Sequence, residues 1–194
     1  MENNSLSLLY DLAINPGKGL TRAREHRPWF FLLGVVILSE ISVVTGATLV
    51  LSRFAAIEGA LFFSGLFLIM VLLTMVWLTN VGILHFFAEL WGKRGRVVDL
   101  FVTLGLSMFP FVFVTPLSLI GEGLGRGRIF FQSVFFTLVL LWCFFLALAA
   151  IEEVYSSSTL EALLILLTPI LLFTGLSIFL LLGCILLISL SFSL

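Results

Sequence analysis

Hydrophobic residues fill five long stretches of this 194-residue chain, and short polar segments separate them. A helix needs ~20 mainly apolar residues to cross a hydrocarbon core ~30 Å thick. The pattern therefore predicts an all-α fold, a polytopic transmembrane helix bundle of five spans that forms one domain over residues 29–194. The spans are expected at Trp29–Leu51, Ala60–Trp91, Val97–Leu119, Ile129–Ile151 and from Leu160 almost to Leu194.

Residues 1–28 form a polar segment before the first span, expected on the cytoplasmic side. Asn15 followed by Pro16 is typical of a helix start, with Asn as the N-cap, and the helix should run to about His26. One interpretation is an interfacial basic helix lying on the anionic headgroups of the cytoplasmic face. The other is that its cations only set topology. The candidate headgroup contacts are Lys18, Arg22, Arg24 and Arg27.

Composition and charge placement add an orientation. Hydrophobic residues make up 61% of the chain and charged residues 11%, which excludes an ordinary soluble domain. With the N-terminus inside, seven basic residues lie in cytoplasmic segments and three lie opposite. Because cytoplasmic loops carry an excess of Lys and Arg, an N-in, C-out topology is predicted. The seven are Lys18, Arg22, Arg24, Arg27, Lys93, Arg94 and Arg96; the three are Arg53, Arg126 and Arg128.

Two prolines interrupt the third span. Pro110 and Pro116 each lack a backbone N–H, and a proline ring clashes with the preceding helical turn. Sharp helix kinks are usually found at such residues. A kink near Phe109 is therefore expected.

Glu40 is the sharpest candidate for a functional residue, because it lies near the midpoint of the first span. An ionisable residue at that depth is costly and suggests a function by default, here a proton or cation site. The alternative is a carboxyl group that joins helices by hydrogen bonding, with Ser107, Thr137 or Thr174 as the candidate partner at similar depth. The helix-joining interpretation is favoured.

His85 and Glu89 are four residues apart and share one helix face near the end of the second span. Asp99 could approach them from the next helix. This spacing suits a metal or a proton relay, but two ligands on one helix make an incomplete zinc site. An interfacial ion-pair cluster with Arg94 or Arg96 is therefore favoured, and no metal, cofactor or catalytic residue is predicted.

Several short motifs resemble the YIP-domain family, five-span membrane proteins named for interaction with Ypt/Rab GTPases. The resemblance covers Leu8 to the C-terminus. Its pieces are Tyr10-Asp11-Leu12 through Asn15-Pro16, Arg27-Pro28-Trp29, the Gly-Lys-Arg-Gly turn at 92–95, Pro110, Trp142, and Tyr155-Ser156-Ser157 leading to Glu161-Ala162. The chain lacks the Asp-Leu-Tyr-Gly-Pro and Gly-Tyr-Gly motifs of eukaryotic members and their long N-terminal region. A prokaryotic-type member in a plasma membrane is therefore expected, and Rab binding is not carried over.

The resemblance implies a non-enzymatic membrane protein that acts through partners. The first hypothesis is an integral membrane adaptor or accessory subunit that organises a protein complex or the bilayer. Its expected partners are anionic lipids and other integral membrane proteins or further copies of itself, and nucleic acid is not among them. The alternative is a small transporter or channel component that uses Glu40 and the proline-kinked third span.

The topology can be tested with reporter fusions. A reporter after Leu194 and a reporter within residues 92–96 are expected on opposite sides of the membrane, because the basic residues divide seven to three in favour of an N-in, C-out chain. Accessibility of each reporter in intact and permeabilised cells is the measurement. Labelling of both reporters from the same side would contradict the five-span topology.

Overall fold

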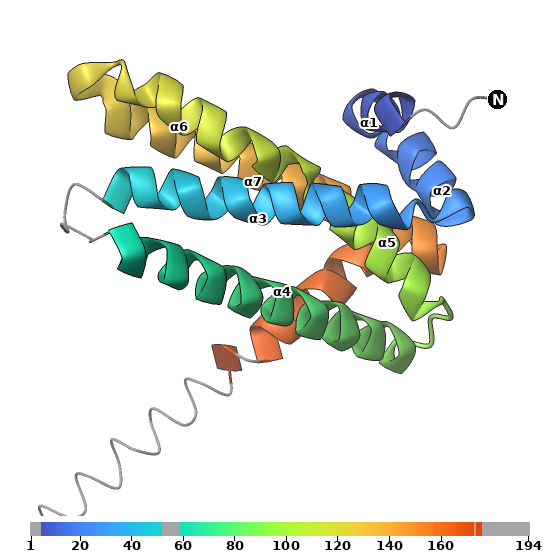
Figure 1. Ribbon diagram of the computed structural model, residues 1–194. Coiled ribbons are helices and arrows are strands. Elements are labelled where there is room, and N and C mark those ends of the chain that lie inside the picture. Colours follow the sequence, from blue (N-terminus) through green and yellow to red (C-terminus); the bar gives the residue numbers. More distant parts are fainter. Residues whose placement is uncertain (1–4, 52–58, 173, 176–194) are drawn as a thin grey trace, which may run out of the picture.

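The computed structural model describes residues 5–51, 59–172 and 174–175, and within these ranges the fold is all-α with no strand. Figure 1 shows the elements in order. They are α1 (Ser5–Ile14), α2 (Pro16–His26), α3 (Trp29–Leu51), α4 (Gly59–Leu90), α5 (Val97–Ser107), the 3₁₀ helix η1 (Phe109–Phe113), α6 (Val114–Glu122), the 3₁₀ helix η2 (Gly125–Gly127) and α7 (Arg128–Tyr155). A further helix, Thr159–Leu172, follows α7.

Four stretches among the described residues are long and apolar enough to cross a membrane. They are Trp29–Leu49, Phe67–Leu90, Val97–Glu122 and Arg128–Tyr155, which correspond to the first four predicted spans. The helix Thr159–Leu172 is also apolar but shorter, and most of the predicted fifth span lies outside the described residues. Four candidate spans are therefore found, and the count of five stays a prediction.

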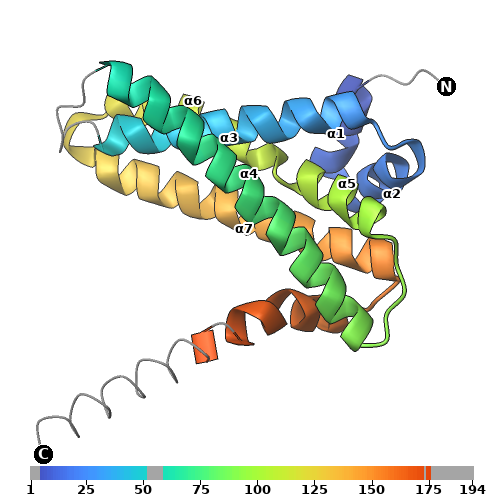
Figure 2. The same ribbon diagram turned by 60° about the horizontal axis from the view of Figure 1, so that its bottom comes forward.

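The long helices run back and forth, so that their ends gather at two opposite ends of the bundle (Figures 1 and 2). One end brings together α2, the turn at residues 91–96 that joins α4 to α5, and residues 152–161 after the last apolar turns of α7. We call this the polar end, because most of the ion pairs of the described residues lie there. The 3₁₀ helix η2 lies at the opposite end.

The helix α2 begins and ends as the sequence predicts. The Asn15 side chain accepts a hydrogen bond from the Lys18 backbone N–H at 3.3 Å, and Pro16 is the first helical residue. Arg27 ends the helix in the left-handed conformation, with φ of 43°. The inner face of α2 is buried against α1, α5 and α7, with Leu20 and Ala23 fully inaccessible. The helix is therefore part of the fold and not a free arm.

The third span is broken where the prolines predict a kink. The α-helix α5 ends at Ser107, η1 replaces it from Phe109, and α6 resumes at Val114. Pro116 has no N–H, so the carbonyl of Val112, four residues earlier, cannot receive its helical hydrogen bond. Such a group is costly in hydrocarbon, where no water can replace the missing donor.

Two serines of α3 bond carbonyls at the break: Ser42 supplies the donor that Val112 lacks, and Ser39 adds a second bond to the Met108 carbonyl, which already accepts from the Phe111 N–H. Ser39 Oγ donates to the Met108 carbonyl and Ser42 Oγ to the Val112 carbonyl, each at 2.9 Å. Ser42 Oγ also accepts from the Thr115 N–H at 2.9 Å, and Thr115 Oγ1 donates to the Ser42 carbonyl at 2.7 Å. The break in the third span is therefore closed by hydrogen bonds from the first span.

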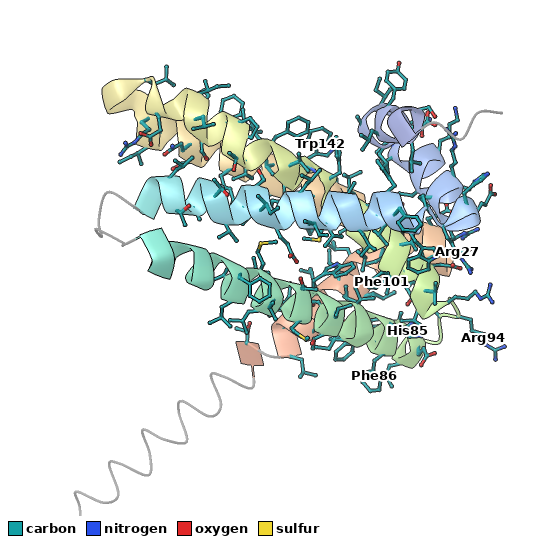
Figure 3. All side chains as sticks on the ribbon, viewed as in Figure 1. Arg27, His85, Phe86, Arg94, Phe101 and Trp142 are labelled. Carbon is teal, nitrogen blue, oxygen red and sulfur yellow. The ribbon has the colours of Figure 1, made fainter. Side chains whose placement is uncertain are left out.

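Close packing surrounds this junction. A Cβ at Gly46 of α3 would lie 2.7 Å from Val114 Cγ1, so only glycine lets α6 approach so near. On the other side, the Trp142 ring of α7 stacks on Phe113, with centroids 6.3 Å apart and planes within 7°, and meets Phe109 edge-on. Figure 3 shows Trp142 beside this part of the bundle. The spans α3, α5–α6 and α7 thus form the tightly packed part of the protein.

Removal of the Ser42 hydroxyl should destabilise the fold. Ser42→Ala leaves the Val112 carbonyl and the Thr115 N–H without their partner, and an unsatisfied buried polar group costs ~1–3 kcal/mol. Unfolding in mixed detergent micelles would measure the loss of stability. Thr137→Ala is the matched control, because Thr137 is exposed and bonds only the Ser133 carbonyl of its own helix. Equal stability of the two variants would contradict the role of Ser42.

Candidate functional site

The polar end is fastened by ion pairs between α2 and two other helices. Arg27 Nη2 donates to Asp99 Oδ1 of α5 at 2.7 Å. Arg24 Nη1 donates to the Glu153 carbonyl of α7 at 2.6 Å and lies 3.2 Å from its Oε1. Both carboxylates are largely buried, with side-chain exposures of 12% and 22%. These contacts hold α2 across the ends of the third and fourth spans.

A second set of contacts joins α4 and its following turn to the end of α7. His85 Nδ1 lies 2.6 Å from the Tyr155 hydroxyl, and His85 Nε2 lies 3.4 Å from Glu89 Oε1. Gly95 packs on the same tyrosine, since a Cβ there would lie 2.6 Å from its ring. The turn between α4 and α5 is therefore seated on Tyr155.

The helix Thr159–Leu172 is tied to the polar end at its first turn. Ser158 and Glu161 form a reciprocal cap, with the Ser158 N–H donating to Glu161 Oε2 at 2.9 Å and the Glu161 N–H to Ser158 Oγ at 3.4 Å. The same carboxylate pairs with Lys93 Nζ at 2.7 Å. The cap and the ion pair together fix where the chain re-enters the apolar region.

The structure divides the cluster that the sequence predicts around His85. His85 lies 3.4 Å from Glu89 on the same helix, but Asp99 pairs with Arg27. Within residues 5–51 and 59–172, neither Arg94 nor Arg96 makes an ion pair, so the predicted pairing with them is wrong. The turn through Gly92, with φ of 74°, directs these arginines outward, and Figure 3 shows Arg94 pointing away from the bundle.

The four candidate headgroup contacts are placed differently from one another. Arg22 pairs with Asp11 at 3.4 Å, and Arg24 and Arg27 pair with acids of α7 and α5. Lys18 lies 3.6 Å from Asp11, but its side chain is 69% exposed. Three of the four cations therefore fasten α2 to the protein, and contact with lipid headgroups stays a proposal for them.

Glu40 is buried between the first two spans, with 4% of its surface exposed. Thr74 Oγ1 of α4 lies 3.0 Å from both carboxyl oxygens. The partners expected from the sequence are not used: Ser107 donates to the Leu104 carbonyl and Thr137 to the Ser133 carbonyl of their own helices. Thr74 was missed, although it lies where an antiparallel second span would place a residue at the depth of Glu40.

No metal centre is found among the described residues, since no group of three or more His, Cys, Asp or Glu side chains converges there. Two apolar hollows are present instead. A cavity of about 270 Å³ lies between α3, α6 and α7, with Gly46, Ser118 and Gln132 in its wall. A groove of about 390 Å³ lies between α4, α5, α7 and the helix Thr159–Leu172, and Asn80 lines it. Glu40 lines neither.

The apolar spans and the paired polar groups between them define a polytopic helical protein that is integral to a membrane. The family model of the Yip1 domain matches residues 10–190, so the chain belongs to the Yip1 domain family, as its resemblance to YIP-domain proteins predicts. No curated protein and no solved structure matches the chain.

The motifs that carry the family resemblance meet at two places in the structure. Most lie at the polar end, where Asp11, Arg27, Lys93, Tyr155 and Glu161 each make one of its contacts. Pro110 and Trp142 lie instead at the break in the third span, where Trp142 contacts Phe109 and Phe113 at the two ends of η1. The motifs of this chain therefore build the fold.

The Arg27–Asp99 pair should stabilise the fold measurably. Arg27→Gln and Asp99→Asn are each expected to lower the free energy of unfolding, and the double variant should lose less than their sum. We expect a coupling of ~1 kcal/mol, because the pair lies between exposed ion pairs (~0.2–1 kcal/mol) and hydrogen bonds to buried charged groups (~1.5–3 kcal/mol). Arg94→Gln is the control and should change stability little. Additive losses in the double-mutant cycle would contradict the pair.

Proposed function

We propose that this protein is a non-enzymatic integral membrane adaptor, an accessory subunit that organises a membrane protein complex through its helix faces. The observation that carries the proposal is the use of polar groups within the spans. Ser39, Ser42 and Thr115 close the break in the third span, and Glu40 joins α3 to α4 through Thr74. These groups hold helices together, and none of them lines either of the two hollows between the described helices.

A transporter or channel component is the rival function. It would need Glu40 to face a path for a proton or cation, and the broken third span to open. Against it, Glu40 is covered by Thr74 and lines neither hollow. The Val112 carbonyl, which Pro116 leaves without its helical donor, accepts from Ser42, and the Met108 carbonyl accepts from Ser39 and from the Phe111 N–H, so neither offers a ready cation site.

The cytoplasmic side of a prokaryotic plasma membrane is the proposed place of the polar end. Its exposed cations, Arg94 and Arg96 on the turn and Lys18 on α2, suit contact with anionic headgroups, each worth ~1 kcal/mol near such a surface. The proposed protein partners are other integral membrane proteins or further copies of this chain. The apolar outward faces of the spans are the surfaces that would meet them.

Glu40 variants separate the adaptor from the transporter. Glu40→Gln keeps a hydrogen-bonding side chain and removes titration, so stability and co-purifying partners should match the wild type. Glu40→Leu and Thr74→Val each remove the bond between α3 and α4, and each should cost ~0.6–2 kcal/mol. The measurements are unfolding in detergent, affinity purification in mild detergent, and proton flux in proteoliposomes. Wild-type proton or cation flux that is lost in Glu40→Gln would overturn the adaptor proposal.

A further inference from the structure

The second span is the least covered of the four candidate spans. Only 11% of its most apolar window is buried, against 56% for the span formed by α5, η1 and α6. Between Phe67 and Leu84 it carries no charged residue, and its outward side chains are mostly apolar. Lipid can cover such a face, so its apolar character alone indicates no protein partner.

Asn80 is the exception on this face. Two neighbouring hydroxyl groups are satisfied: Thr74 Oγ1 bonds Glu40, and Thr79 Oγ1 donates to the Met75 carbonyl at 2.8 Å. The Asn80 side chain is exposed and has no hydrogen-bond partner among the described residues. Its amide, with two donors and an acceptor, is thus a polar group of this face that the described residues leave unsatisfied.

The depth of Asn80 in the membrane makes an unsatisfied amide costly. Glu40 marks the middle of the first span and contacts Thr74, and Asn80 lies six residues further along α4. Six residues correspond to ~9 Å at 1.5 Å per residue, whereas half of the hydrocarbon core is ~15 Å thick. The amide therefore lies inside the hydrocarbon, about 6 Å short of the level where lipid headgroup and ester oxygens begin. An acyl chain could fill the adjoining groove but could not hydrogen-bond the amide.

We propose that α4 is the self-association surface of this protein, with the Asn80 amides of two copies hydrogen-bonded to each other across a two-fold axis. An amide is both donor and acceptor, so it can pair with the same amide of a second copy. A hydroxyl such as that of Thr79 already donates to a carbonyl of its own helix and has no proton left for such a bond. Closed two-fold pairing is also the commonest arrangement of identical chains. Asparagine is among the side chains that hydrogen-bond across helices in membranes.

The groove beside Asn80 fits this arrangement. It is lined by residues of α4 and of the helix Thr159–Leu172, among them Leu84 and Ile170. Val76, four residues before Asn80 on the same helix face, is 59% exposed. In the dimer, apolar side chains such as the second copy's Val76 fill the groove while the amides pair. This surface rests on the proposed adaptor function and specifies one of its partners, a second copy of the chain.

Cysteine cross-linking tests the surface in the native membrane. In a background with Cys143→Ala and Cys184→Ala, Asn80→Cys and Val76→Cys should each give a disulfide-linked dimer on oxidation. Leu78→Cys is the matched control, because Leu78 is 41% exposed at nearly the same depth but lies two residues, ~200° of helix rotation, from Asn80. Equal cross-linking at positions 78 and 80, or no dimer at position 80, would overturn the proposal.

Dimer affinity tests the amide itself. In liposomes of defined protein-to-lipid ratio, energy transfer between labelled copies should show a dimer for the wild type. Asn80→Leu should raise its dissociation constant about 8- to 900-fold, the equivalent of ~1.2–4 kcal/mol for two symmetry-related interhelical hydrogen bonds, and Asn80→Gln should stay within about 3-fold. A wild type that remains monomeric, or an Asn80→Leu variant that pairs as well as the wild type, would overturn the proposal. Other proteins that still co-purify in either case would leave the adaptor function standing.

Discussion

The rest of the structure depends on how the third span satisfies its backbone at the two prolines. In hydrocarbon no water is present to hydrogen-bond an unpaired carbonyl or N–H, so a helix broken by proline needs hydrogen-bond donors from a neighbouring helix. Ser42 of α3 provides one for the Val112 carbonyl, Ser39 adds a bond to the Met108 carbonyl, and Thr115 Oγ1 donates to the Ser42 carbonyl of α3. The same contacts fix the register of α3 against η1 and α6. With this register, Gly46 lies against Val114 of α6, and Trp142 of α7 packs on Phe109 and Phe113 of η1.

Hydrogen bonds join the helices inside the bundle, and ion pairs join them at the polar end. Arg24 and Arg27 reach acids on α7 and α5, and Lys93 reaches the cap of the last described helix. The acids are largely buried, so the arginines offset a cost that unpaired carboxylates would impose there. This explains why a segment that looks like a detachable basic arm packs as part of the fold. The cations left over, Arg94 and Arg96, stand on an outward turn where solvent or a headgroup can reach them.

Local features of this fold can be predicted from the sequence, and contacts distant in sequence cannot. Asn15 and Pro16 predict the start of α2 because capping is a matter of adjacent residues, and Pro110 predicts the break for the same reason. The apolar stretches predict five spans, and the first four are found among the described residues, because length and hydropathy decide them. Glu40 stands out by its depth, but its partner depends on which face α4 presents. Asp99 pairs with Arg27, 72 positions away, and no sequence pattern predicts that contact.

The uneven packing of the spans bears on what kind of protein this is. The most apolar windows of the spans in α3, α5–α6 and α7 are 44%, 56% and 28% buried, against 11% for α4. The polar and aromatic contacts of α4 are Thr74 with Glu40, Trp77 with Phe101 and His85 with Tyr155. A span needed only to complete a closed bundle would be expected to bury more of itself, because packing is a main source of helix association in lipid. Val81, Leu84 and Ala88 of α4 are buried in the core, whereas much of its other side is left uncovered by the described residues. A helix that is held in position and still exposes an apolar face suits a protein that functions by binding other membrane proteins through that face.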